Sequence, residues 1–270
     1  MAGHVRRLLS LACEDAELGA TLDAGGGAAG LLMVTGGSQT RVGSHRMYER
    51  LASALAERGV SCLRFDRRGV GDSGGEDPGF RGSGPDIAAA ATVLRAQCPR
   101  PGRLYGFGLC DGATALALFG DAAGLDGLIL VNPWLVETEA GAPPPAAIRQ
   151  HYRRRLLSRE GWRKIVAGTV DYRKLLDGVM KIARRRETAP LARQVADALA
   201  RHRLPTRLIL AAGDSTAIAA AVEMRAGIFK GLVGEARKID SDSHTFARPD
   251  DEASLLQAVA DTVDDLNASR

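Results

Sequence analysis

Short runs of apolar residues recur along the whole chain, each bounded by Gly, Pro or Asp and each too short to form an independent helix. Runs of this length, rich in Leu, Val and Ile, are typical of buried β-strands. The pattern predicts eight strands, which cover residues 8–12, 18–22, 31–34, 61–65, 103–107, 127–131, 207–212 and 236–239.

Stretches with helical periodicity lie between most of the later strands. In residues 46–57, for example, Met47, Leu51 and Leu55 are spaced so that they share one face of a helix. Similar stretches cover residues 87–96, 113–119, 217–229 and 252–266. Strands and helices that alternate in this way form a mostly parallel sheet with helices on both faces, so we predict an α/β fold.

One segment interrupts this alternation. After Asn132-Pro133-Trp134 come the prolines at 143–145, and then a long, strongly charged stretch with a helical pattern before the next strand. We interpret residues 135–203 as an inserted helical cap. Residues 1–134 and 204–270 then form the α/β core domain.

Charge is distributed unevenly between these two parts. Residues 149–203 contain 16 Lys and Arg against five Asp and Glu, a net charge of +11, whereas the remainder has 20 basic and 27 acidic residues, a net charge of −7. The arginine clusters at 153–155 and 184–186 cannot all point one way on a helix, so at least part of this charge faces solvent. Solvation alone is one interpretation; the other is recruitment of a CoA-like thioester, an acidic saccharide or an anionic membrane surface.

Composition narrows the class of protein further. A chain of 270 residues, of which 45% are hydrophobic, can bury a substantial core. Only 4% of the residues are aromatic, and the sequence has no nucleic-acid recognition motif, so we expect no nucleic-acid partner. No apolar run reaches the roughly 18–20 residues that span a bilayer. The four cysteines, at 13, 62, 98 and 110, form no C-x-x-C pair and fit neither a disulfide framework nor a zinc site. We expect a cytoplasmic protein without metal or cofactor, with peripheral contact between the basic cap and the inner membrane as a further hypothesis.

Two glycine motifs near residue 70 resemble functional signatures. Gly71-Asp72-Ser73-Gly74-Gly75 matches G-x-S-x-G, but a nucleophilic serine of that motif needs a strand just before it and a helix just after it. Here the sequence leads into a Gly/Pro-rich loop at 76–85. The overlapping G-x-G-x-x-G at 69–74 also lacks the helix that would hold a pyrophosphate. We therefore interpret Ser73 as part of a structural turn.

Cys110 is the better candidate for a nucleophile. It stands where the strand at 103–107 turns sharply into the helix at 113–119, with Gly108 two residues before it and Gly112 two residues after it. Such a turn has no room for Cβ atoms at those two positions. A thiol at a helix N-terminus is also more readily ionised. For the other three cysteines, inert packing is the better interpretation.

A thiolate nucleophile needs a base, and the base needs an acid that orients it. Asp214 follows the strand at 207–212, and His244 lies in the loop after the last strand. The order nucleophile, acid, histidine is that of the α/β-hydrolases. The alternative is that Asp214 caps the next helix and His244 is a surface residue. Capping and packing explain His45 nearly as well as a site role, so we leave it out of the triad.

The chain resembles an α/β-hydrolase over nearly its whole length, including the motif D-x-R-G-x-G-x-S at 66–73. It resembles the exosortase A system-associated hydrolases of the first type more closely, through residues 36–46, Gly108-Leu109-Cys110-Asp111 and the segment 131–134. Dienelactone hydrolases also carry Cys at the corresponding turn. The resemblance implies a bacterium that makes exopolysaccharide, but it implies no particular substrate.

These residues predict acyl transfer from an ester, thioester or lactone. Cys110 attacks the carbonyl, His244 takes and returns the proton, and Asp214 fixes the tautomer of the imidazole. Because a thioester intermediate also reacts with amines and thiols, an acyltransferase remains an alternative to a hydrolase. The rival from another class is a catalytically silent member of the fold that binds a ligand or partner. The sequence does not define the oligomeric state.

The oxyanion would be held by the backbone N–H of Asp111 and by that of Gly37 or Ser38 in the loop after the third strand. The alternative is that this glycine pair forms only a tight turn. The Asp111 carboxylate would oppose thiolate formation if it turned toward the sulfur. Gln39 and Arg41 lie next to the same loop, and we expect them to line the pocket.

Overall fold

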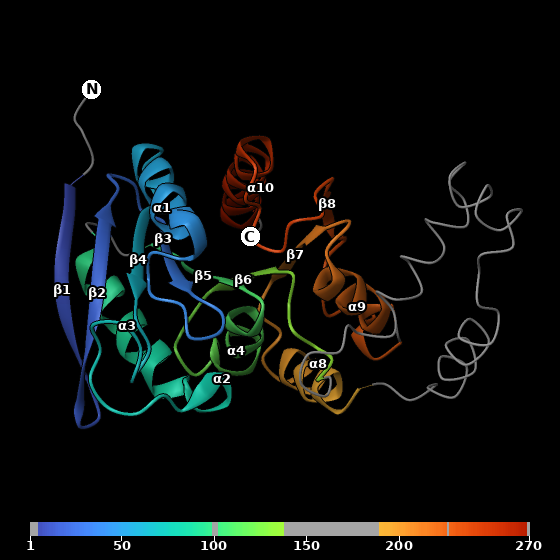
Figure 1. Cartoon of the computed structure of the whole chain (residues 1–270), viewed down its shortest axis with the longest axis horizontal. Helices are drawn as coiled ribbons and strands as arrows, with labels where there is room; N and C mark the ends of the chain where they lie inside the picture. The colour runs from blue at the N-terminus through green and yellow to red at the C-terminus, as the bar shows by residue number, and fades with distance from the viewer. Residues whose placement is uncertain (1–4, 99–101, 138–188, 226, 269–270) are drawn as a thin grey trace, which may run out of the picture.

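The computed structural model describes residues 5–98, 102–137, 189–225 and 227–268 (Figure 1). All eight predicted strands are present, each within three residues of its expected bounds. They are β1 (Val5–Cys13), β2 (Ala16–Ala24), β3 (Gly30–Val34), β4 (Ser61–Phe65), β5 (Leu104–Leu109), β6 (Gly127–Val131), β7 (Thr206–Ala211) and β8 (Arg237–Ile239).

The strands form one sheet in the order β1-β2-β4-β3-β5-β6-β7-β8. β1 is antiparallel to β2 and β2 is antiparallel to β4, whereas every pair from β4 to β8 is parallel. Val34 of β3 lies opposite Gly108 of β5, and Leu109 lies opposite Val131 of β6. The carboxyl ends of these parallel strands therefore meet at one edge of the sheet, where ligands bind in open α/β folds.

Helices cover both faces of the sheet, as predicted, and each face has its own apolar core. One face carries α1 (Met47–Glu57) and α10 (Pro249–Ala268), and the other carries α3 (Gly84–Gln97), α4 (Asp111–Phe119) and α8 (Pro190–His202) (Figure 1). The remaining described helices are α9 (Ser215–Met224) and the short turns η1 (Ser44–Arg46), α2 (Gly79–Gly82) and η2 (Gly227–Phe229). In α1, Met47, Leu51 and Leu55 are all buried, which confirms the face predicted from their spacing.

Helix α8 falls inside the stretch that we interpreted as the cap. Its residues Leu191, Val195 and Leu199 recur every four positions, are buried, and join the same apolar core as α4. This helix is therefore packed on the sheet domain. The arginine clusters at 153–155 and 184–186 and most of the predicted cap lie outside the described residues.

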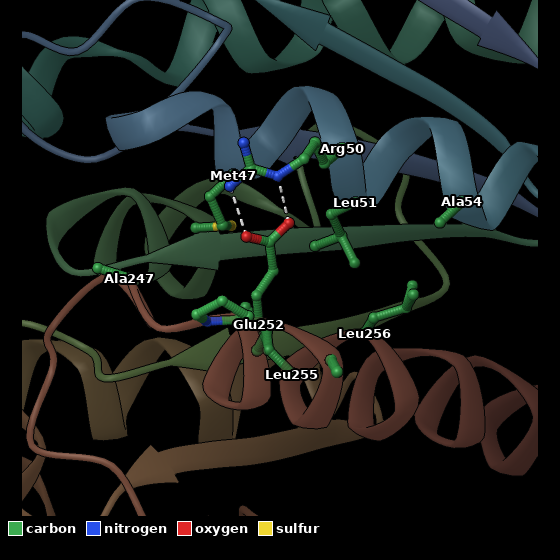
Figure 2. Close-up of a pocket in the computed structure, with 10 residues that line it drawn as sticks. Met47, Arg50, Leu51, Ala54, Ala247, Glu252, Leu255 and Leu256 are labelled. Carbon is green, nitrogen blue, oxygen red and sulfur yellow. Dashed lines mark hydrogen bonds and ion pairs between the residues drawn. The ribbon is translucent and has the colours of Figure 1, made fainter.

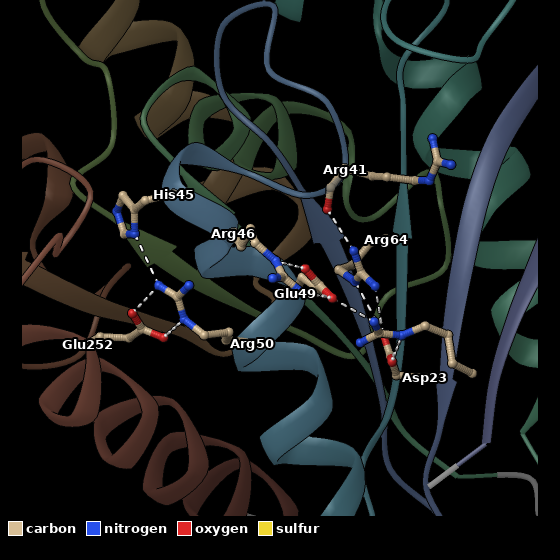
Figure 3. Close-up of polar contacts among 9 residues, drawn as sticks. Asp23, Arg41, His45, Arg46, Glu49, Arg50, Arg64 and Glu252 are labelled. Carbon is tan, nitrogen blue, oxygen red and sulfur yellow. Dashed lines mark hydrogen bonds and ion pairs between the residues drawn. The ribbon is translucent and has the colours of Figure 1, made fainter. Parts of the chain in front are cut away.

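A buried ion pair joins the strands at the antiparallel edge of the sheet. Asp23 of β2 is fully buried and pairs with Arg64 of β4 at 2.9 Å and with Arg6 of β1 at 2.6 Å (Figure 3). Removal of Asp23 would leave the buried guanidinium of Arg64 without its counter-ion, at a cost of about 3–5 kcal/mol. The described part of the chain includes no helix that is long and apolar enough to cross a membrane.

Candidate active site

Cys110 occupies a strained turn between β5 and α4. Its backbone has φ 61° and ψ −126°, a conformation that costs a residue other than glycine about 1–3 kcal/mol. Hydrogen bonds on both sides hold it there: its N–H donates to the carbonyl of Val131 at 3.1 Å, and its carbonyl accepts from the N–H of Trp134 at 3.1 Å. The turn presents the partly exposed thiol at the N-terminus of α4.

The glycines around Cys110 are required by space. A Cβ on Gly108 would lie 2.7 Å from backbone atoms of Gly112, and a Cβ on Gly112 would lie 2.5 Å from the carbonyl oxygen of Val34. Gly36 in the loop after β3 is equally confined, because its Cβ would lie 3.0 Å from that of Cys110. This confirms that the predicted turn has no room for side chains at 108 and 112.

Asp214 follows β7 and is the N-cap of α9. Its Oδ2 accepts the N–H of Ala217 at 2.9 Å, and the same oxygen lies 3.0 Å from Nδ1 of His244. The side chain is only 6% exposed. One oxygen atom of Asp214 thus makes both of the contacts that we considered, the cap of the next helix and the pair with His244.

His244, in the loop after β8, lies between the carboxylate and the thiol. Its Nδ1 pairs with Asp214, and the Cys110 side chain is close enough to the ring to raise its pKa. Burial of the ring lowers the pKa of His244, but the hydrogen bonds and negative charges of Asp214 and Cys110 outweigh this effect and raise the pKa to about 10. The structure therefore brings the three predicted triad residues together from three separate strand ends.

The loop after β3 meets Asp111 at the start of α4. The N–H of Gly37 donates to Oδ1 of the Asp111 side chain at 2.6 Å, so this carboxylate occupies one of the two N–H groups expected to hold an oxyanion. On the other side of Gly37, its carbonyl accepts from Arg67, which is 2% exposed. Neither Nε nor Nη1 of Arg67 has a hydrogen-bond partner among the described residues. Ser38, the alternative donor, is exposed.

Gln39 and Arg41 are tied into the surrounding turns. Oε1 of Gln39 accepts the N–H of Ser44 at 3.2 Å. Arg41 forms ion pairs with Asp66 and, at 2.7 Å, with Asp72. These contacts connect the loop after β3 to the turn after β4, and a pocket-lining role for the two side chains stays a prediction.

Ser73 is a structural residue, as predicted. Its hydroxyl donates to the carbonyl of Asp66 at 2.7 Å and accepts the N–H of Gly19 at 2.9 Å. It therefore closes the turn after β4 and ties that turn to β2.

The sequence of this chain matches a known protein family. Residues 31–261 match the sequence profile of the alpha/beta hydrolase family. The chain belongs to this family. The match confirms the predicted fold class and, at the level of family, the expectation of a hydrolase. No curated protein sequence matches significantly.

Several solved structures resemble this one over nearly the full chain. An esterase from Pyrococcus furiosus is 15% identical, with 98% of this chain and 92% of that chain covered and a TM-score of 0.65. A dienelactone hydrolase from Anabaena variabilis is 13% identical, with 96% of each chain covered and a TM-score of 0.60. The thioesterase domain from the curacin biosynthetic pathway is 15% identical, with coverage of 96% and 99% and a TM-score of 0.61. At these identities the likeness shows a shared fold.

Two residues of this hydrolase support the site and were not predicted. Asn132, fully buried with φ 42°, donates from Nδ2 to the carbonyl of His244 at 3.0 Å and accepts the N–H of Ala211 at 2.9 Å. The hydroxyl of Tyr48 donates to the carbonyl of Val34 at 2.9 Å and accepts the N–H of Leu109 at 3.1 Å. The position of Asn132, a polar residue directly after the apolar run at 127–131, could have indicated its role from the sequence. Tyr48 gave no such indication, because it fits the apolar pattern of its helix.

Proposed function

We propose that this alpha/beta hydrolase cleaves an ester, thioester or lactone through a covalent acyl-enzyme on Cys110. One observation carries the proposal: a thiol in a strained turn at a helix N-terminus interacts with the ring of His244, whose Nδ1 lies 3.0 Å from Asp214. A nucleophile, a base and an orienting acid in this relation are what covalent acyl transfer needs. A surface histidine would need no such pair of partners.

The protonation state of the pair favours attack by sulfur. With a pKa of about 10, the imidazole of His244 is protonated at neutral pH, and its charge stabilises a Cys110 thiolate. The thiolate attacks the carbonyl carbon and forms a tetrahedral oxyanion. When this collapses, the C–O or C–S bond of the substrate breaks, and the leaving alcohol or thiol takes its proton from His244.

The second half of the reaction regenerates the enzyme. The acyl group is now a thioester of Cys110, and His244 is neutral. His244 removes a proton from water, the hydroxide attacks the thioester carbonyl, and Cys110 leaves as a thiolate. An acyltransferase would differ only in that an amine, alcohol or thiol takes the place of water.

The oxyanion is held by the N–H of Asp111 together with a second N–H from the loop after β3. Removal of one such donor typically costs about 10²–10³ in rate. Because the carboxylate of Asp111 accepts the N–H of Gly37 in the resting enzyme, either this side chain turns away when substrate binds or Ser38 is the second donor.

The wider context of the reaction is also a proposal. We infer a role in exosortase-associated or exopolysaccharide metabolism from the resemblance of residues 36–46, 108–111 and 131–134 to that group of hydrolases. A cytoplasmic location fits the four cysteines, none of which forms a disulfide. The net charge of +11 in residues 149–203 favours an anionic acyl donor or contact with an anionic membrane.

The proposal is tested with p-nitrophenyl acetate and a panel of acyl-CoA thioesters. We expect Cys110→Ala and His244→Ala to abolish turnover, while Cys98→Ala, a control at a partly buried cysteine, turns over like the wild type. A Cys110→Ala protein that is as active as the wild type would contradict the role of Cys110. A wild type that binds such compounds without turnover would indicate a catalytically silent binding module.

A further inference from the structure

His45 adopts a strained conformation in a turn that precedes α1. Its φ is 42°, that of the next residue, Arg46, is 65°, and both are thus left-handed residues other than glycine. Each such residue costs about 1–3 kcal/mol, and strain of this kind persists only where surrounding contacts maintain it. Because His45 is exposed, burial of its ring does not explain the conformation.

Hydrogen bonds of the imidazole define its tautomer. Nδ1 of His45 lies 3.3 Å from Nη2 of Arg50 (Figure 3). A guanidinium only donates, so Nδ1 is the acceptor and the ring hydrogen is on Nε2. Nε2 then donates to the carbonyl of Thr245 at 3.0 Å. Thr245 is the residue directly after His244 in the chain.

Arg50 is itself fixed by Glu252 of α10. Two hydrogen bonds of 2.5 Å join the guanidinium to the two carboxylate oxygens across a groove of about 460 Å³ between α1 and α10 (Figure 2). The apolar side chains of Met47, Leu51 and Leu256 line this groove. Thus a continuous series of polar contacts runs from α10 through α1 and His45 to the loop that carries His244.

We propose that His45 is a positioning residue for His244. Asn132, directly after β6, holds the carbonyl of His244, and His45 holds the carbonyl of Thr245 from the turn before α1. The two bonds fix consecutive peptide groups, and so fix the direction in which the imidazole of His244 leaves the backbone. The inference rests on the proposed function, in which this imidazole must stay within hydrogen-bond reach of Cys110.

The turn at 43–46 offers variants that separate the side chain from the backbone. His45→Gly removes the imidazole and also relieves the left-handed strain, so the protein should remain folded. His45→Gln places an amide nitrogen near the position of Nε2 and so retains a donor for Thr245. Arg46→Gly is the matched control: it relieves the same kind of strain and removes a side chain that pairs with Glu49, away from the His244 loop.

We expect His45→Gly to lower kcat for p-nitrophenyl acetate about tenfold, with KM within twofold, since a misplacement of 1 Å costs up to about 10²-fold. The rate at which iodoacetamide alkylates Cys110 at pH 7 should fall in parallel. His45→Gln should recover most of both rates, and Arg46→Gly should match the wild type. A circular-dichroism melt of each variant verifies that it is folded.

Three results would overturn this inference: a His45→Gly protein as fast as the wild type, a His45→Gln protein as slow as His45→Gly, or an Arg46→Gly protein that is equally slow. The variant His244→Ala distinguishes failure of this inference from failure of the proposed function. If His244→Ala abolishes turnover while His45→Gly does not affect it, the proposed function stands and the positioning role is wrong. If His244→Ala itself retains full turnover, the proposed function is wrong.

Discussion

Asp214→Asn removes one negative charge from the site and preserves its shape. In the wild type, Oδ2 of Asp214 accepts both from the backbone of Ala217 and from Nδ1 of His244. The carbonyl oxygen of an asparagine amide can accept the same two bonds, and the N–H of Ala217 orients that oxygen toward His244. Because Asn caps helices about as well as Asp, we expect the contribution of the helix cap to stability to be nearly unchanged.

The expected effect on the titration of His244 follows from the lost charge. A hydrogen bond to a charged group contributes about 1.5–3 kcal/mol, against about 0.5–1.5 kcal/mol for a neutral one, so the variant loses about 1–2 kcal/mol of imidazolium stabilisation. At 1.36 kcal/mol for each pKa unit, the pKa of His244 should fall from about 10 by about 0.7–1.5 units, so the ring stays protonated at pH 7. The tautomer is retained, because the oxygen still faces Nδ1.

The assay is a pH titration of His244 between pH 5 and 11, followed by the NMR signal of its imidazole, which is identified by its absence from His244→Ala. We expect the pKa of His244 to fall by about 0.7–1.5 units from about 10 in Asp214→Asn. An unchanged pKa would refute the assignment of Asp214 as the orienting acid.

Stability should depend on pH with a defined sign. The pKa of His244 is raised from 6.5 in the unfolded chain to about 10 in the folded one, so its protonated ring stabilises the fold fully below pH 6.5 and loses this effect as the pH rises through about 10. Asp214→Asn lowers the folded pKa. The difference in unfolding free energy between wild type and variant should therefore be larger at pH 6 than at pH 10.5, as urea denaturation can measure.

Two further substitutions test other parts of the site. Ser73→Ala removes a donor to Asp66 and leaves the N–H of Gly19 without this acceptor. Urea denaturation should therefore show an unfolding free energy lower by about 1–3 kcal/mol, while kcat per folded molecule should not change. A large loss of kcat would restore Ser73 as a candidate for the nucleophile. Asp111→Ala frees the N–H of Gly37, so kcat/KM for p-nitrophenyl acetate should rise, by up to the roughly 10² that one oxyanion donor contributes; a decrease would indicate that the carboxylate supports catalysis.

The sequence predicted the sheet and the strand ends at which the three candidate residues lie, because both depend on local pattern. Each strand is an apolar run bounded by turn residues, and Cys110, Asp214 and His244 each follow such a run. In a parallel sheet the carboxyl ends of the strands meet at one edge, so residues far apart in the chain come together. The glycines at 108 and 112 added a steric requirement that only a sharp turn explains.

Other features depend on contacts that no local pattern specifies. The bond between His45 and Thr245 joins residues 200 positions apart, and its existence depends on how two loops are docked. The bond from Gly37 to Asp111 depends on one side-chain rotamer. Helix α8 was assigned to the cap because the basic residues around it obscured the apolar spacing of Leu191, Val195 and Leu199, which packs it on the core.

The covalent intermediate on Cys110 is the most direct test of the central claim. The protein is mixed with p-nitrophenyl acetate, quenched in acid within seconds, digested, and analysed by mass spectrometry. We predict an acetyl group on the wild-type peptide that contains Cys110. Hydroxylamine should remove this group, and Cys110→Ala should lack it. In His244→Ala it should accumulate only if the substitution slows deacylation more than acylation. Turnover by the wild type with no acyl group on Cys110, and equal turnover by Cys110→Ala, would contradict the account.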